Sequence, residues 1–112
     1  MMKEVMAVIR PSRWTVTVEA LNEAGFSAMT RQRAYGRGKQ KGLRYGPEGG
    51  GIQELPKWWV SLVVEDLEVE RAVAAILKAN RSGEIGDGKV FVCPVQEAVR
   101  IRTDESGVLA IS

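Results

Sequence analysis

The chain has 112 residues, of which 45% are hydrophobic and 27% charged, and its net charge is +2. These values predict one soluble globular domain spanning residues 1–112. No apolar run reaches the length of a membrane span and no signal-peptide core is present, so we expect a cytoplasmic protein without membrane insertion. The absence of histidine and the single cysteine, Cys93, exclude an internal disulfide, a Cys–His pair and a thiolate zinc site.

The first half of the chain is typical of a strand, a helix and a second strand. A continuous apolar run at residues 5–9 predicts a strand covered on both faces, which Pro11 ends because it has no N–H to donate. Ser12 is the expected N-cap of a helix that Gly25 terminates. The apolar face of this helix carries Trp14, Val18, Leu21 and Ala24. After the helix, residues 26–35 predict a polar strand.

The next segment, from Gly36 to Pro56, reads GRGKQKGLRYGPEGGGIQELP and holds seven of the 12 glycines. Four cationic side chains against two glutamates give it a charge of +2, which equals that of the whole chain. A structureless loop of this length is uncommon in a compact domain unless it is functional or disordered. We therefore expect residues 37–55 to form a flexible loop that meets an anion or a partner protein.

A strand, a helix and a strand follow the loop. Residues 58–64 are a near-continuous apolar run, and Asp66 is the expected N-cap of a helix that Gly83 terminates. A glycine-rich turn, GEIGDGK, then leads to a short strand at residues 90–93.

The C-terminal part carries two arginines at a spacing of two residues. In an extended segment, this spacing places the side chains of Arg100 and Arg102 on the same face. Residues 104–112 are expected to form a loose tail.

This order of elements predicts an α+β, ferredoxin-like βαββαβ fold, with an antiparallel sheet, both helices on one face and the long loop between strands 2 and 3. The other face of such a sheet needs a cover, and Trp58 and Trp59 point to opposite faces, so oligomerisation is expected. The fold by itself does not select a function.

Three sets of residues are candidates for anion binding: residues 36–42, the turn Gly86–Lys89, and the pair Arg100 and Arg102. Glycine backbone can present several N–H groups to an anion, and guanidinium groups match phosphate oxygens. Each set also has a structural explanation, as a solvated loop, a turn shaped by Asp87, or a charged strand edge. Their coincidence in one small neutral domain favours anion binding.

The sequence resembles the PII nitrogen-regulatory signal-transduction proteins over about residues 2–104. The resemblance implies a homotrimer of ferredoxin-like subunits that binds ATP or ADP in the clefts between subunits. With MgATP in place, 2-oxoglutarate would bind beside it. The matching stretches are Lys3–Pro11, Gly25–Thr30, Gly36–Gly42, Leu55–Lys57, Gly83–Val92 and Val99–Thr103, of which the last two are close to family signatures.

The resemblance also implies roles by position. Met29 and Thr30 would lie near the adenine, with Val63 and Val64 lining its pocket, and Gln40 would coordinate Mg²⁺. The other implied nucleotide contacts are Gly36, Lys39, Gly86, Gly88, Lys89, Arg100 and Arg102. The implied 2-oxoglutarate contacts are Lys57, which would pair with a carboxylate, together with Arg10, Gly38, Gln40, Lys41, Gly42 and Gly86.

Three positions depart from the commonest family pattern. Lys39 stands where arginine is usual, Ser61 stands where glutamate is common, and Tyr45 is the only tyrosine of the loop, in an unmatched context. Regulation by uridylylation is therefore not expected. The GRGKQKG variant and the short loop look more like the nitrogenase-associated branch of the family.

The resemblance implies a metabolite sensor and not an enzyme: ATP, ADP and 2-oxoglutarate select among loop conformations, and the loop binds or leaves a target protein. Nitrogenase proteins are the favoured target, an ammonium channel or glutamine synthetase are alternatives, and no nucleic-acid partner is implied. From the residues alone, an RNA- or other anion-binding module stays open, although the RNP1 pattern is missing. A small hydrolase or transferase also stays open, although no general base is evident.

Overall fold

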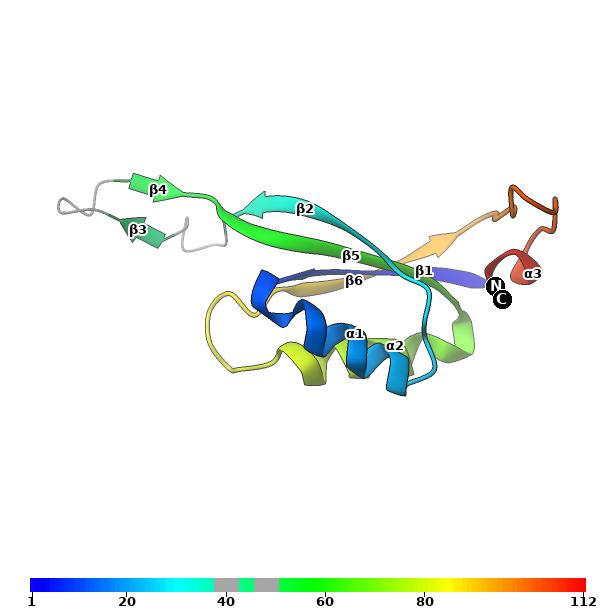
Figure 1. Cartoon of the computed structure of the whole chain (residues 1–112), viewed down its shortest axis with the longest axis horizontal. Coiled ribbons are helices and arrows are strands. Elements are labelled where there is room, and N and C mark those ends of the chain that lie inside the picture. The colour runs from blue at the N-terminus through cyan, green and yellow to red at the C-terminus, as the bar shows by residue number, and fades with distance from the viewer. Residues whose placement is uncertain (38–42, 46–50) are drawn as a thin grey trace.

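The computed structural model describes residues 1–37, 43–45 and 51–112 (Figure 1). The main sheet has four strands, β1 (Met2–Ile9), β2 (Thr30–Gly36), β5 (Leu55–Glu65) and β6 (Lys89–Val95). They lie in the order β2-β5-β1-β6, and every neighbouring pair is antiparallel. Helices α1 (Trp14–Glu23) and α2 (Val69–Asn80) lie together on one face (Figure 1). The predicted ferredoxin-like α+β fold is confirmed.

The core lies between the sheet and the two helices. Because side chains alternate along a strand, every second residue of β1 and β5 faces the helices. These residues are joined by apolar side chains of α1, α2 and the turn after α1. The core consists of Val5, Ala7, Ile9, Leu21, Phe26, Val60, Leu62, Val64, Ala72 and Ile76.

The opposite face of the sheet is also apolar, and neither α1 nor α2 covers it (Figure 1). Met6 and Val8 of β1 and Trp59 of β5 are half-buried there, and Phe91 of β6 is 45% exposed. The register places Phe91 opposite Met6 and Trp59 opposite Val8, so these side chains share one face. The expectation that residues 5–9 are covered on both faces holds for one face only.

Both helices begin differently from the sequence prediction. A short 3₁₀ helix, η1 (Pro11–Arg13), precedes α1, and its N-cap is Arg10 without a side-chain hydrogen bond, so the prediction of Ser12 as N-cap is wrong. A second one, η2 (Asp66–Glu68), precedes α2. Its cap is a reciprocal capping box between Glu65 and Glu68, so Asp66 is the first residue of the turn and not the cap.

The helix ends agree with the prediction at Gly25 and differ at Gly83. Gly25 has a φ of 98°, and the N–H of Phe26 donates to the carbonyl of Leu21, as in a Schellman cap. Helix α2 ends earlier, at Asn80, whose side chain donates to Thr17 of α1 and to its own helix at Ile76. This buried contact joins the two helices.

Part of the predicted long loop is regular structure. Strands β3 (Leu43–Tyr45) and β4 (Gly51–Gln53) pair antiparallel as a separate two-stranded ribbon. The ribbon lies beyond the end of the main sheet where β2 ends and β5 begins (Figure 1).

The C-terminal residues form a folded turn, so the expectation of a loose tail is wrong. The segment from Val99 to Ser106 closes on itself through an isolated bridge between these two residues, and the helix α3 (Val108–Ile111) follows. Arg100 and Arg102 lie within this turn, since the N–H groups of residues 103 and 104 both donate to the Arg100 carbonyl. The prediction that both arginines lie on one face of an extended segment is therefore also wrong.

Candidate anion-binding site

The turn between α2 and β6 is organised around the carboxylate of Asp87. It accepts hydrogen bonds from the backbone N–H groups of Ser82 and Gly83, at 2.8 and 2.9 Å, and from the Ser82 hydroxyl. Arg10 donates to it from β1's end, at 2.8 Å. The bonds from Ser82, then the one from Arg10, hold the pKa of the Asp87 carboxyl well below its usual range. Asp87 thus shapes the turn, in agreement with the structural explanation given for this residue from the sequence.

Two glycines of this turn are required by its geometry. Gly86 and Gly88 have φ values of 100° and 101°, which are unfavourable for residues with a side chain. A Cβ at Gly88 would lie 1.8 Å from the carbonyl oxygen of Val8, which is a clash with the backbone of β1. A Cβ at Gly86 would lie 3.0 Å from a guanidinium nitrogen of Arg10. The turn therefore packs its bare backbone against β1 and Arg10.

Cationic side chains gather around the same turn. Arg10 also donates to the carbonyl of Ile85, at 2.9 Å, and the Lys57 ammonium lies 3.3 Å from the carbonyl oxygen of Gly86. Partial burial, and then the charge of Arg10, lower the pKa of the Lys57 ammonium. Lys89 begins β6 directly after the turn. An anion bound here would offset this local excess of positive charge.

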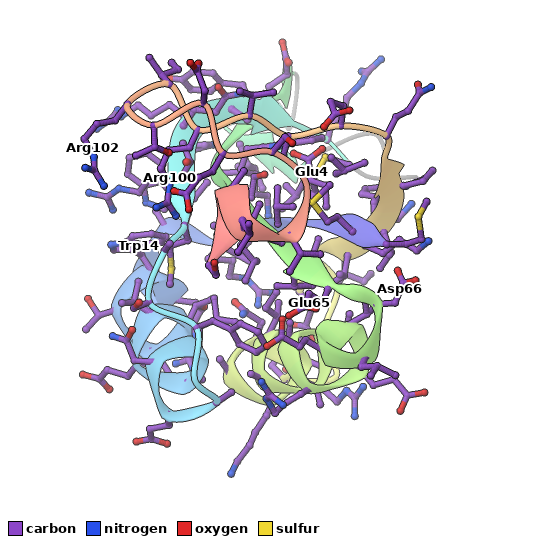
Figure 2. All side chains as sticks on the ribbon, turned by 90° about the vertical axis from the view of Figure 1, so that its right-hand side faces the viewer. Glu4, Trp14, Glu65, Asp66, Arg100 and Arg102 are labelled. Atoms are coloured by element: carbon purple, nitrogen blue, oxygen red, sulfur yellow. The ribbon has the colours of Figure 1, made fainter. Side chains whose placement is uncertain are left out.

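The predicted arginines of the C-terminal turn lie at the other end of the molecule. The Arg100 guanidinium pairs with Glu105, at 3.3 Å, and donates to the carbonyl of Ser112. Figure 2 shows Arg100 beside α3 and Arg102 pointing outward. The register agrees with this separation, because Lys89 lies opposite Val8 at one end of β1 and Val95 lies opposite Met2 at the other.

The predicted site residues therefore fall into two groups at opposite ends of the sheet. Along β2, Thr30 and Gly36 are about 20 Å apart. Gly36 pairs with Leu55, close to Lys57, whereas Thr30 pairs with Ser61, in the half of β5 that is farther from the loop. The first group comprises Arg10, Gly36, Lys57, Gly86, Gly88 and Lys89. The second comprises Met29, Thr30, Val63, Val64, Arg100 and Arg102.

The accessibility of the second group is uneven. Thr30 and Arg102 are exposed and Met29 is half-buried, packed against the core. Val63 is half-buried on the open face of the sheet, whereas Val64 is a core residue and is 3% exposed. Val64 can therefore offer only backbone to a ligand. The predicted residues Gly38, Lys39, Gln40, Lys41 and Gly42 lie outside the described residues.

The role of Ser82 and the contact between Arg10 and Asp87 were not found from the sequence. Ser82 lies five residues before Asp87, and Arg10 lies 77 residues before it. A serine followed at that distance by a Gly-Asp-Gly turn is a signal that could have suggested the first contact. The second contact depends on the pairing of β1 with β6. None of the helices in the described part of the chain is long and apolar enough to span a membrane.

Comparison with known proteins gives a consistent result. The family model described as nitrogen regulatory protein P-II matches residues 2–105. A nitrogen fixation nifHD region GlnB-like protein 2 from Methanobacterium ivanovii is 44% identical, over 98% of this chain and 99% of that protein. A nitrogen regulatory protein P-II from Azospirillum brasilense is 47% identical, over 98% of this chain and 100% of that protein.

A solved structure is similar over the whole fold. The crystal structure of Arabidopsis thaliana PII bound to citrate matches with a TM-score of 0.81 and 31% sequence identity. The match covers 99% of this chain and 90% of that chain.

Proposed function

The chain belongs to the nitrogen regulatory protein P-II family, and from this premise we propose that it senses ATP or ADP together with 2-oxoglutarate and regulates a protein of nitrogen fixation. The names of its relatives associate this part of the family with the nifHD region, which supports nitrogenase as the target over an ammonium channel or glutamine synthetase. The protein acts as a regulator and not as an enzyme.

The observation that carries this proposal is the turn of bare backbone at residues 82–89, around which three cationic side chains gather. Glycines in the left-handed region expose backbone, and Arg10, Lys57 and Lys89 supply the positive charge that phosphates and carboxylates require. Lys57 suits a 2-oxoglutarate carboxylate because an anion would compensate the unfavourable proximity of Arg10. Gln40, as the proposed Mg²⁺ ligand, would complete the site from outside the described residues.

The separation of the two groups of residues supports a site shared between subunits. Within one chain, Arg100 and Arg102 are too far from Lys89 to contact the same triphosphate. A neighbouring copy that presents its C-terminal turn to the residue 82–89 turn would bring both groups onto one ligand. A homotrimer provides three such boundaries, and the apolar open face of the sheet offers the surface on which the copies would pack.

Regulation follows from linkage between the ligand and the loop. The loop at residues 37–55 begins next to Gly36 and ends next to Lys57, so a ligand held at Lys57 favours some loop conformations over others. A target that binds the loop in a different conformation weakens 2-oxoglutarate binding, and 2-oxoglutarate weakens target binding by the same factor.

Calorimetric titration tests the proposal. We expect 2-oxoglutarate to bind only when MgATP is present, and Lys57→Ala to abolish that binding while MgATP still binds. Binding of 2-oxoglutarate without nucleotide would contradict the shared site. Equal loss of both ligands in Lys57→Ala would show that the role assigned to Lys57 is wrong.

A further inference from the structure

A cluster of two arginines and two tryptophans lies on the helix side of the sheet, away from the turn described above. Arg31 and Arg33 of β2 pair with Val60 and Trp58 of β5, so their side chains share the face on which α1 packs. The Arg31 guanidinium lies 4.4 Å from the ring centre of Trp14 and 4.2 Å from that of Trp58. Arg33 lies 5.6 Å from the Trp58 ring. We call Arg31, Arg33, Trp14 and Trp58 the Arg–Trp cluster.

The stacking fixes both guanidinium groups without using their hydrogen-bond donors. Cation–π contact engages the flat faces of a guanidinium, whereas its N–H groups point outward in its plane. Both arginines are exposed, and among the described residues neither forms an ion pair or a side-chain hydrogen bond. Arg10, Arg71 and Arg100 differ, because each pairs with a carboxylate. The Arg–Trp cluster thus presents oriented cations that lack an anion.

A hollow of about 230 Å³ continues the cluster toward the loop. It is lined mainly by apolar atoms, and its wall includes Pro11, Arg33, Tyr35, Pro56, Lys57 and Trp58. Sites for small molecules usually measure about 300–1,000 Å³, so this hollow suits a single apolar side chain better than a free metabolite. Tyr35 continues the row of Arg31 and Arg33 at a spacing of two residues and is exposed.

We propose that the Arg–Trp cluster and the adjoining hollow bind an extended acidic segment of a partner protein. Arg31 and Arg33 are about 7 Å apart along β2, and alternate side chains of an extended peptide have the same spacing. Two carboxylates at such positions pair with the two guanidinium groups, and an apolar residue further along occupies the hollow. Charge complementarity selects the acidic partner.

A nucleic-acid partner fits the surface less well. Proteins that bind nucleic acid through phosphates carry a broad basic surface, whereas this chain has a net charge of only +2. The Arg–Trp cluster does not include the residue 82–89 turn, but the adjoining hollow shares Lys57 with the proposed 2-oxoglutarate site. Binding at the two arginines is therefore tested with neither nucleotide nor 2-oxoglutarate present, so that its failure is distinguishable from failure of metabolite sensing.

The test uses the full-length chain and a synthetic peptide, Glu-Ser-Glu-Ser-Phe-Ser, blocked at both ends. Binding is followed by calorimetry and by the fluorescence of the tryptophans, which the peptide lacks. We expect the peptide to bind the unaltered protein. The double variant Arg31→Gln, Arg33→Gln should bind it at least about tenfold more weakly, because each lost charged hydrogen bond exceeds the free energy of a tenfold change in affinity.

The matched control is Arg81→Gln, which removes one charge from an exposed position just after α2. It should bind the peptide within about twofold of the unaltered protein. A peptide with glutamine in place of glutamate should bind weakly to every variant. Arg33→Gln alone leaves the stack of Arg31 on both tryptophans intact, so it gives a second reading should the double variant unfold.

Four results would overturn the proposal. The first is no binding of the peptide to the unaltered protein. The second is that the double variant Arg31→Gln, Arg33→Gln and the single variant Arg33→Gln bind the peptide as tightly as the unaltered protein does. The third is tighter binding of oligothymidylate than of the peptide, lost in the arginine variants, which would assign the surface to nucleic acid. The fourth is a changed sedimentation coefficient in those variants, which would make the cluster a contact between copies of the chain.

Discussion

Lys57 illustrates how a binding residue can oppose folding. Its ammonium is partly buried beside Arg10, and these two causes lower its pKa. The charged form is therefore less favourable in the folded chain than in the unfolded one. The penalty is fully present at pH values below the lowered pKa, and it disappears as the pH rises toward the ordinary value of about 10.4.

Lys57→Met should therefore stabilise the protein while weakening 2-oxoglutarate binding. Because the side chain is largely solvated, we expect a gain of only about 0.5 kcal/mol in the free energy of unfolding at pH 7. Urea denaturation at pH 7 and at pH 10 measures this, and the gain should shrink at the higher pH. A loss of stability at pH 7 would show that the contact with the Gly86 carbonyl outweighs the penalty.

Asp87 has the opposite linkage. Its hydrogen bonds from Ser82, Arg10 and Gly83 favour the ionised carboxylate and lower its pKa. A carboxyl group with a lowered pKa stabilises the fold fully above its unfolded value of about 3.9, and this contribution is lost as the pH falls from there through the folded value.

Asp87→Asn should accordingly melt at a lower temperature than the unaltered protein at pH 7. The difference in melting temperature should shrink as the pH falls below about 4, because asparagine does not titrate. Thermal unfolding of both proteins between neutral and acidic pH provides the measurement. A constant difference over that range would mean that the ionised form of Asp87 is not what the turn requires.

At the scale of elements, the α2–β6 turn should tolerate substitution very unevenly. Gly83 and Gly88 both have positive φ, but a Cβ at Gly83 meets nothing within 4 Å, whereas one at Gly88 meets the Val8 backbone. Gly83→Ala should cost about 1 kcal/mol of stability, from backbone strain alone. Gly88→Ala should cost about 3 kcal/mol or more, because β1 must also shift.

Gly36→Ala is the control for this series. A Cβ there also meets nothing within 4 Å, and Gly36 does not have positive φ, so stability should change little. Denaturant unfolding of the three variants should give that rank order. Equal destabilisation by Gly83→Ala and Gly88→Ala would show that the close approach to Val8 is not a constraint.

The sequence predicted the elements better than their ends. Apolar runs, the polar pattern of residues 26–35 and the glycine at residue 25 predicted the four strands of the main sheet and α1, because periodicity and left-handed backbone are local properties. Strands β3 and β4 were not predicted. Asp66 was the expected cap of α2 because aspartate is a common N-cap residue, but the 3₁₀ turn η2 precedes α2 and is capped by Glu65. The spacing of Arg100 and Arg102 suggested a strand, but their turn closes through the bridge between Val99 and Ser106.

The candidate site was predictable in its residue types and not in its assembly. Glycine, lysine and arginine indicated anion binding, and the resemblance supplied Arg10 and Lys57. Only the pairing of β1 with β5 and β6 brings Arg10 and Lys57 beside Asp87 and Gly86. The Arg–Trp cluster was missed for the same reason, since Trp14 and Trp58 meet Arg31 from α1 and β5, through contacts far apart in sequence.

At the scale of the whole molecule, the two ends of the sheet carry the two halves of the proposed nucleotide site. A single chain cannot close that site on itself, because the sheet that orders both halves also holds them apart. Assembly and ligand binding should therefore be coupled, and a change that separates the subunits should also remove nucleotide binding.

Phe91→Glu should show this coupling. Phe91 lies opposite Met6 on the open apolar face, where a carboxylate in place of the phenyl ring would oppose the packing of an apolar surface. We expect the unaltered protein to sediment as a trimer and the variant as a monomer with at least about tenfold weaker ATP binding. Leu67→Glu is the matched control, because Leu67 is 97% exposed in η2, outside the sheet, and should leave both properties unchanged. A Phe91→Glu protein that stays trimeric would remove the open face from the proposed subunit contact, and a monomeric variant that binds ATP normally would place the whole site within one chain.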